Sequence, residues 1–472
     1  MNHNENRSPT LAMAVSILII VLIWMIVGIV ALKLNVQMVI FIAIIAVSLV
    51  CYFGLHNSVD DIIENMASSV GNTVSGLFFF FLIGMAIAIW MISGCLPAVV
   101  YYGMKLMNPV IFLPITFVLS SIFSLCTGSA WTTAGTIGIV CFGIGMTLGI
   151  PDAMTVGAVV SGAYFGDKMS PVSDSTTLAP ISSGTDVFSH IRAMLHVTVP
   201  AYVIAFIMYL AVGFRFQVSG GNIQAAIDLE QAILDHFDVN PFVLLPLLLV
   251  VALSVMRKPA IPTLLAGIVV AVPIALIFQH QTFTAAINCM ASGVSLDIEN
   301  EIVAKIVNRG GISSMMGTLS IVMIALAFGG LMSGSGIFPV VLDALTEKIK
   351  NPRAYPAIVI LTSGLLVIAT SSNYVPLTLS GKMFGKAYDD VGLDRSMLSR
   401  NIEEGATITA VLCPWASSAV YYVGVFGVPV MAYFPYSFLN ILTVVMGCLL
   451  PLCGLTLVTK EGTERGRKVS NG

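Results

Sequence analysis

The chain has 472 residues, a net charge of −3, 57% apolar residues and only 10% charged residues. Its mean hydropathy is +0.96, and no Asp, Glu, Lys or Arg lies between Glu64 and Lys105. Such a run exceeds the roughly 20 apolar residues that cross a bilayer. The composition therefore excludes a soluble enzyme, a nucleic-acid-binding protein and a disordered tail, and it indicates the lipid bilayer as the surroundings of the chain.

The first apolar run follows Arg7 and is predicted to be a membrane span, because it is too long for a signal-peptide core and lacks a cleavage signal. The predicted hydrophobic segments, in chain order, are 11–32, 36–55, 76–96, 109–126, 127–149, 152–165, 193–214, 241–256, 259–279, 314–334, 354–372, 401–427 and 433–457. Several are short or broken, so we expect roughly 11 to 13 segments. The short connections leave no soluble domain, and the expected fold class is an all-α polytopic membrane protein.

The chain contains an internal repeat. Shifting the sequence by 243 residues aligns 108–175 with 351–418 without a gap, with 13 of 68 positions identical. The identities favour Gly, Pro, Ser and Thr, which set backbone structure. We therefore expect two related halves, 1–235 and 236–472, as in transporters whose binding site lies between repeats near the middle of the membrane.

Charges around 354–381 suggest that the halves have inverted topology. Basic residues flank this segment on both sides, whereas the matched flanks of the first half carry only Lys105; the basic residues are Lys348, Lys350, Arg353, Lys382, Lys386, Arg395 and Arg400. If positive loops face the cytoplasm, both ends of 354–381 lie on one side, which requires a re-entrant hairpin with its tip near 370–373. The alternative is a single span whose lysines Lys348 and Lys350 extend from an outside loop.

The densest polar cluster in an apolar setting is 161–177. We expect Gly166 and Pro171 to break the helix that precedes them, with Asp167 and Asp174 on either side. A carboxylate at bilayer depth costs about 2.5–3.5 kcal/mol, so two of them beside an unwound backbone predict a cation and proton site. The alternative is a loop at the membrane surface in which Asp167 and Lys168 are solvated.

The second half differs at the matched positions. It carries Ala410 and Ser417 in place of the two aspartates, and it has Glu404 where the first half has Ser161. We expect Glu404 to face the protein interior and Glu403 to be solvated. Two small polar segments recur at the repeat offset and are predicted to line the site as hairpin tips, against the alternative of tight helix packing; their candidate residues are Thr127, Ser129, Thr370, Ser372 and Asn373.

The run 166–180, Gly-Asp-Lys-Met-Ser-Pro-Val-Ser-Asp-Ser-Thr-Thr-Leu-Ala-Pro, resembles the signature of the NhaC family of bacterial sodium/proton antiporters. The resemblance implies a bacterial inner-membrane protein of two inverted repeats that exchanges external protons for internal sodium. Carried over by position, it implicates five residues in ion binding: Asp167, Ser170, Ser173, Asp174 and Thr176. Relatives with the same signature exchange malate for sodium and lactate.

Our first hypothesis is a sodium/proton antiporter in which Na⁺ and H⁺ compete at Asp167 and Asp174, with Glu404 contributing from the other half. The second is an organic anion exchanger of the malate/lactate type, with Lys168 as a cationic partner. We do not expect an enzyme, because the chain lacks His-Glu-x-x-His and Gly-x-Ser-x-Gly. The eight cysteines have no Cys-x-x-Cys spacing, so we expect no zinc site and no cofactor. The oligomeric state is left open, a homodimer included.

Overall fold

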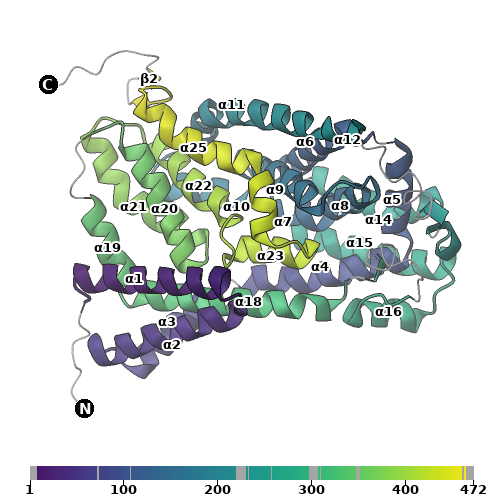
Figure 1. Cartoon of the computed structure of the whole chain (residues 1–472), viewed down its shortest axis with the longest axis horizontal. Coiled ribbons are helices and arrows are strands. Elements are labelled where there is room, and N and C mark those ends of the chain that lie inside the picture. The colour runs from purple at the N-terminus through teal and green to yellow at the C-terminus, as the bar shows by residue number, and fades with distance from the viewer. Residues whose placement is uncertain are drawn as a thin grey trace.

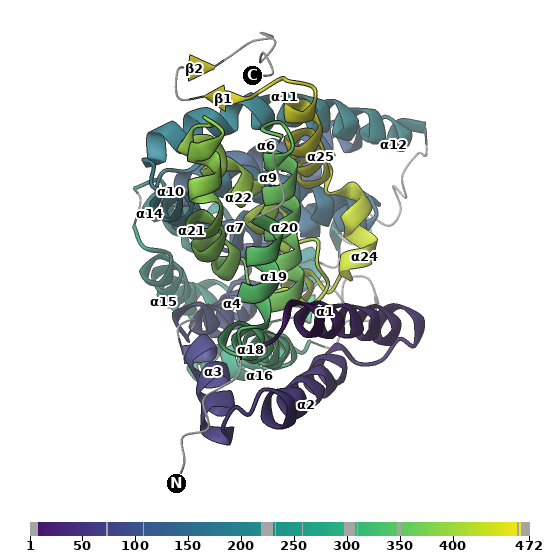
Figure 2. The ribbon, with the colours of Figure 1, turned by 90° about the vertical axis from the view of Figure 1, so that its left-hand side faces the viewer.

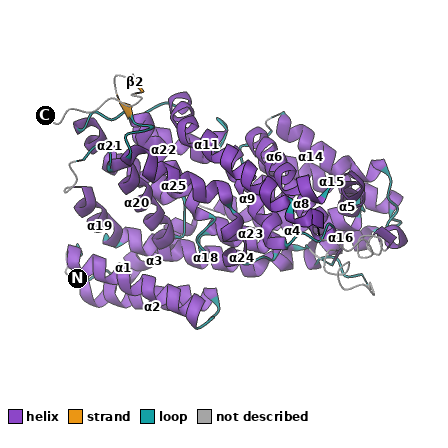
Figure 3. Cartoon of the chain, turned by 45° about the horizontal axis from the view of Figure 1, so that its top comes forward, coloured by secondary structure: helices purple, strands orange, loops and turns teal. Residues whose placement is uncertain are grey.

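The structure is a computed structural model that describes residues 8–71, 74–106, 108–218, 230–231, 233–256, 258–296, 307–308, 310–346, 351–459 and 462–463. Almost every element in these ranges is a helix (Figure 3). One short antiparallel hairpin near the C-terminus pairs β1 (Val458–Thr459) with β2 (Gly462–Thr463). The predicted all-α fold class is confirmed.

Three N-terminal helices lie along one edge of the molecule. They are α1 (Leu11–Ile26), extended by a π-helical turn η1 (Val27–Ala31), α2 (Val36–Gly54) and α3 (Val59–Gly71). The side chains of Thr10 and Asn35 cap α1 and α2 by accepting hydrogen bonds from Met13 N at 3.3 Å and Gln37 N at 2.9 Å. Helices α2 and α3 pack on the long helix α18 (Ile312–Gly334), as Figures 1 and 2 show.

The remainder of the first half is a run of helices around α6 and α9. In order they are α4 (Val74–Ile92), α5 (Cys95–Leu106), α6 (Pro109–Thr127), α7 (Ala130–Thr133), the π-helical turn η2 (Ala134–Gly138), α8 (Ile139–Thr147), α9 (Asp152–Met169), α10 (Asp174–Ser183), α11 (Val187–Gly213) and α12 (Arg215–Val218). A peripheral group follows and packs against α4 and α5: η3 (Pro241–Leu244), α14 (Leu245–Val255), α15 (Ala260–Phe278) and α16 (Phe283–Ser292).

The second half continues from α18 to the C-terminus. Its helices are α19 (Ile337–Thr346), α20 (Tyr355–Thr370), α21 (Tyr374–Asp390), α22 (Arg395–Ala410), α23 (Ser417–Phe426), α24 (Val430–Tyr433), η4 (Phe434–Tyr436) and α25 (Phe438–Leu452). Helix α22 lies in the middle of this group, in contact with α10, α11, α20, α21 and α25.

Six helices in the described ranges are long and apolar enough to cross a membrane: Leu11–Ile29, Val36–Gly54, Pro109–Thr127, Val187–Gly213, Ile261–Phe278 and Ile312–Gly334. Two further segments are helix pairs bent by 70° and 89°, and five are shorter apolar helices. These six, two and five segments together agree with the predicted 11 to 13. Only six of the described segments are long enough for a straight crossing, which is fewer than the number of predicted spans. The reason is that several apolar runs form bent or shorter helices.

The backbone repeats the 243-residue offset of the sequence. Helices α10 (174–183) and α23 (417–426) occupy matched positions, and α6 and α20 end at the matched residues Thr127 and Thr370. Residues with left-handed backbone conformation follow the same offset, in the pairs Gly128 and Ser371, Gly149 and Gly392, and Gly184 and Gly427. Inverted topology and a boundary at 235/236 stay predictions.

The segment 354–381 doubles back on itself as a helical hairpin. The Ser363 hydroxyl donates to the Ser380 hydroxyl at 3.1 Å, although the two residues lie on opposite sides of the turn at Ser371. The rings of Tyr355 and Tyr388 meet edge to face at 5.9 Å near the open end. These contacts require α20 and α21 to run antiparallel side by side, with their turn at the predicted tip. That the hairpin is re-entrant stays a prediction. Lys348 and Lys350 lie outside the described residues.

Candidate ion-binding site

The predicted helix break lies between α9 and α10. Residues 170–173, with Pro171 among them, separate the two helices. Gly166 does not break α9, contrary to the prediction. A Cβ at Gly166 would lie 2.3 Å from Leu125 N of α6, so the glycine allows the two helices to approach closely. The Ser170 hydroxyl then donates to Leu125 O at 2.8 Å and ties the break to α6.

Asp167 is at the centre of this break. Its Oδ1 accepts a hydrogen bond of 2.6 Å from the Ser173 hydroxyl, and the Ser175 hydroxyl lies 3.1 Å from that of Ser173. The Thr176 hydroxyl donates to Asp167 O at 2.9 Å. Asp167 is half-buried, whereas Asp174 is exposed at the first position of α10. The break therefore gathers one half-buried carboxylate and several hydroxyls, with Asp174 at its edge.

The tip of the first hairpin lies against the break. Gly128 has a φ of 67°, and a Cβ there would lie 2.8 Å from Val172 Cγ2 and 3.1 Å from Ser173 N. Any larger residue would push the tip away from the break. The Ser129 hydroxyl accepts from Thr132 N at 3.2 Å and caps α7, whose first amide, that of Ala130, faces the Asp167 carboxylate. A helix N-terminus is thus directed at the carboxylate.

Hydroxyls within each tip also follow the repeat. The Thr127 hydroxyl donates to Ser129 O at 3.4 Å, and the Thr370 hydroxyl donates to Ser372 O at 3.1 Å. Both tips therefore use a threonine hydroxyl to stabilise the turn, which is a structural role beside the predicted lining role.

The second tip lies against the second break, between α22 and α23. Ser371 O accepts from Ser417 N at 2.8 Å, and Thr370, Ser372 and Asn373 are buried there. The next residue, Tyr374, lies close enough to Asp167 and Asp174 for both carboxylates to interact electrostatically with its hydroxyl. Both hairpins therefore approach the first break, the first by its tip and the second by the start of α21.

Four buried charged side chains extend the site between α9 and α22. Lys168, Arg400, Glu403 and Glu404 all have exposed fractions of 0%. Glu404 is interior, as predicted, and its Oε1 lies 3.9 Å from Arg400 Nε. Glu403 was predicted to be solvated, and this is wrong, because neighbouring helices cover α22 on all sides. The surface-loop alternative is wrong for Lys168, which is enclosed, whereas Asp167 is half-buried and Pro171 and Val172 of the break are exposed.

The charge of Glu403 acts on Asp167, while Lys168 interacts with both glutamates and with Arg400. Within the described ranges, no hydrogen-bond partner is present for Lys168 Nζ or for the Glu403 carboxylate oxygens at standard geometry. The spacing of Arg400 and Glu404, four residues apart on a helix, is a signal from which their pairing could have been predicted.

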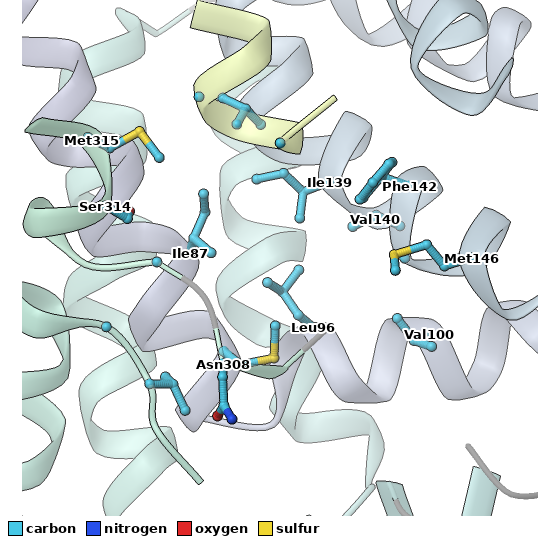
Figure 4. A pocket seen from close by; sticks show the side chains of 18 of the residues that line it. Ile87, Leu96, Val100, Ile139, Val140, Phe142, Met146, Asn308, Ser314 and Met315 are labelled. Atoms are coloured by element: carbon cyan, nitrogen blue, oxygen red, sulfur yellow. The ribbon is translucent and has the colours of Figure 1, made fainter. Parts of the chain in front are cut away.

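A cavity of about 530 Å³ lies elsewhere, between α4, α5, α8, α18 and α23 (Figure 4). Its walls are largely apolar and include Leu96, Phe142 and Met315. None of the predicted site residues lines it, so the charged chemistry and this cavity are separate features. No cluster of three or more His, Cys, Asp or Glu side chains suited to a metal ion occurs in the described part of the chain.

Comparison with known proteins identifies relatives along most of the chain. The model of the Na⁺/H⁺ antiporter family matches residues 162–455, which include the first break and all of α22. The chain is 36% identical to the Na⁺/H⁺ antiporter NhaC of Alkalihalophilus pseudofirmus, over 86% of this chain and 88% of that protein.

Two further relatives have other names. The malate-2H⁺/Na⁺-lactate antiporter of Bacillus subtilis is 32% identical over 98% of this chain and 99% of its own length. The arginine/ornithine antiporter ArcD of Halobacterium salinarum is 30% identical over 93% of this chain and 91% of its own. The family model covers more than half of the residues of this chain, and the relatives align with most or nearly all of them. This multi-pass membrane protein therefore belongs to the Na⁺/H⁺ antiporter family.

Proposed function

We propose that the protein exchanges Na⁺ for H⁺ across the bacterial inner membrane and that the two ions compete for the Asp167 carboxylate. The observation that carries the proposal is the position of Asp167. Its carboxylate sits at the break between two helices, bonded to the Ser173 hydroxyl and faced by a helix N-terminus.

The oxygen chemistry of this position suits an alkali cation. Hard cations prefer oxygen ligands, and a helix break frees main-chain carbonyls that must be satisfied by protein, water or an ion. The Ser173 hydroxyl can turn its oxygen lone pairs toward Na⁺ in place of donating to Asp167. A proton on the carboxylate removes the charge that holds Na⁺, so the two ions exclude each other and exchange follows if the empty site does not reorient.

The charge balance of the site favours one monovalent cation. When ionised, the carboxylates of Asp167, Glu403 and Glu404 carry three negative charges, and Lys168 and Arg400 carry two positive charges. The group has a net charge of −1, which one Na⁺ or one proton neutralises. Neutralisation lowers the cost of keeping the group away from water.

A second candidate is exchange of an organic anion of the malate type. The relative with that name aligns over 98% of this chain, and the buried amine of Lys168 lies next to Asp167 in sequence. A dicarboxylate at the same place would make the net charge of the group −3 instead of −1. We therefore rank Na⁺/H⁺ exchange first.

The test is a proteoliposome assay with the purified full-length protein and a pH-sensitive dye inside. An imposed Na⁺ gradient is expected to drive proton movement in the absence of malate and lactate. Asp167→Asn should abolish this movement, and Asp174→Asn should reduce it less, because Asp174 is exposed. Lys105→Gln, in an exposed ion pair with Glu230, is the matched control and should behave as the parent protein. Proton movement that requires malate or lactate would establish the second candidate, and full activity of Asp167→Asn would contradict the proposed site.

A further inference from the structure

The first hairpin tip is held by hydroxyl groups from the other half of the molecule. The Tyr422 hydroxyl donates to Ala130 O at 3.0 Å, and the Tyr421 hydroxyl donates to Trp131 O at 2.8 Å. The ring of Tyr421 also stacks on that of Trp131, with centroids 4.7 Å apart and planes 8° apart. Both tyrosines have exposed fractions of 0%, so water does not compete for these bonds.

The helix that receives these bonds has an unusual backbone. Directly after α7 the chain forms the π-helical turn η2, and the amide of Ala134 is shared between Ala130 O and Trp131 O. A π-helical turn disturbs the regular pattern of carbonyl acceptors, and such turns are frequent at functional sites. Gly135 lies within the turn, and a Cβ there would come 3.0 Å from the Tyr421 hydroxyl oxygen. Ile83 Cδ1 would lie even nearer to such a Cβ, so the absence of a side chain at Gly135 leaves space for both Ile83 and the tyrosine.

The tyrosine contacts have no equivalent at the matched positions of the other hairpin, where the Ser182 hydroxyl of α10 donates to Leu377 O of α21 instead. The positions that match Tyr421 and Tyr422 are Leu178 and Ala179, which carry no hydroxyl, and α21 runs through the matched turn as a regular α-helix. The arrangement is therefore specific to the hairpin whose tip contacts Asp167.

We propose that Tyr421 and Tyr422 are positioning residues that hold the N-terminal turn of α7 against the Asp167 carboxylate and thereby set the affinity for the transported cation. This inference rests on the proposed function at Asp167. The two hydroxyls do not touch the ion. They fix two carbonyls of the turn whose Ala130 amide faces the carboxylate, and they link α23 of the second half to the tip of the first hairpin.

The test uses Tyr421→Phe, Tyr422→Phe and the double variant, which keep both rings and remove only the hydroxyls. A neutral hydrogen bond contributes a modest net free energy, so each single variant should raise the half-saturating Na⁺ concentration about two- to tenfold. The maximal exchange rate should change less. Sodium-dependent thermal stabilisation of the purified protein gives the same affinity without transport, because a bound ion stabilises the folded state by mass action.

Tyr209→Phe is the matched control. Its hydroxyl is also buried and lies within hydrogen-bond distance of Gly157 O at 2.9 Å, of Tyr436 O at 2.7 Å and of the Ser161 hydroxyl at 2.7 Å, away from the tip. This variant should lower thermal stability and leave the half-saturating Na⁺ concentration unchanged.

An unchanged half-saturating concentration in both single tyrosine variants would overturn the inference, as would an equal rise in Tyr209→Phe. If the double variant does not purify as a folded protein, the single variants still decide between these outcomes. The proposed function itself fails if the unsubstituted protein shows no Na⁺-driven proton movement, and this outcome is distinct from any effect of the tyrosine variants.

Discussion

Replacing Arg400 with Met is expected to cause one of the largest losses of stability in the protein. Arg400 Nε lies 3.9 Å from Glu404 Oε1, and both side chains have exposed fractions of 0%. The guanidinium also donates to Asn401 Oδ1 at 3.1 and 3.2 Å and to Thr456 O at 3.2 Å. Removing one partner of a buried ion pair leaves an uncompensated charge and costs about 3–5 kcal/mol.

The companion variants make the reasoning quantitative. Glu404→Gln should cost less, about 1–3 kcal/mol, because Arg400 keeps the oxygens of Asn401 and Thr456 as acceptors. The double variant Arg400→Met/Glu404→Gln should be more stable than the sum of the single effects predicts, by about 1–3 kcal/mol, since it buries neither charge alone.

The assay is denaturant unfolding of the purified protein in detergent micelles, followed by intrinsic fluorescence or circular dichroism. The exposed pair Lys105 and Glu230, with Nζ and Oε1 3.1 Å apart, is the control, and Lys105→Met there should leave the free energy of unfolding nearly unchanged. Additive effects of the two buried substitutions, or a loss in Arg400→Met no larger than in Lys105→Met, would refute the reasoning.

Three further predictions concern packing, topology and cation affinity. Gly162→Ala should lower the melting temperature strongly, because its Cβ would lie 2.3 Å from a carbonyl oxygen of α6, whereas Gly364→Ala, with its nearest neighbour at 3.5 Å, should be nearly neutral. In a background without native cysteines, Asn351→Cys and Asp390→Cys should react with an impermeant thiol reagent from the cytoplasmic side only; labelling from opposite sides would contradict a re-entrant hairpin. Ser173→Ala removes the 2.6 Å hydrogen bond to the Asp167 carboxylate and should raise the half-saturating Na⁺ concentration about tenfold or more in the proteoliposome assay. An unchanged value would exclude this hydroxyl as a ligand.

The local structure of the site follows from local sequence. Pro171 within a polar run predicts that α9 cannot continue, and the structure ends that helix at Met169. The 243-residue offset predicts matched turns, and the structure places left-handed residues at Gly128 and Ser371. A break, a cap or a turn depends on residues within a few positions of one another, so one sequence is sufficient to find them.

Which polar groups are enclosed depends on tertiary structure. Glu403 and Glu404 are neighbours on α22 and point in different directions, so a helix with one covered face would hide only one of them. Both are buried because α10, α20, α21 and α25 surround α22. Asp174 looks equivalent to Asp167 in sequence, yet it is exposed.

The contact of Tyr422 with Ala130 joins residues 292 positions apart. No local pattern encodes that contact, because it forms only when two distant helices of the two halves pack together. The sequence by itself therefore determined the helices and most of their breaks, and it predicted an ion-binding chemistry for the first break. Tertiary packing alone decided which charges are removed from water and which residues hold the tip, because burial depends on neighbours that are remote in the chain.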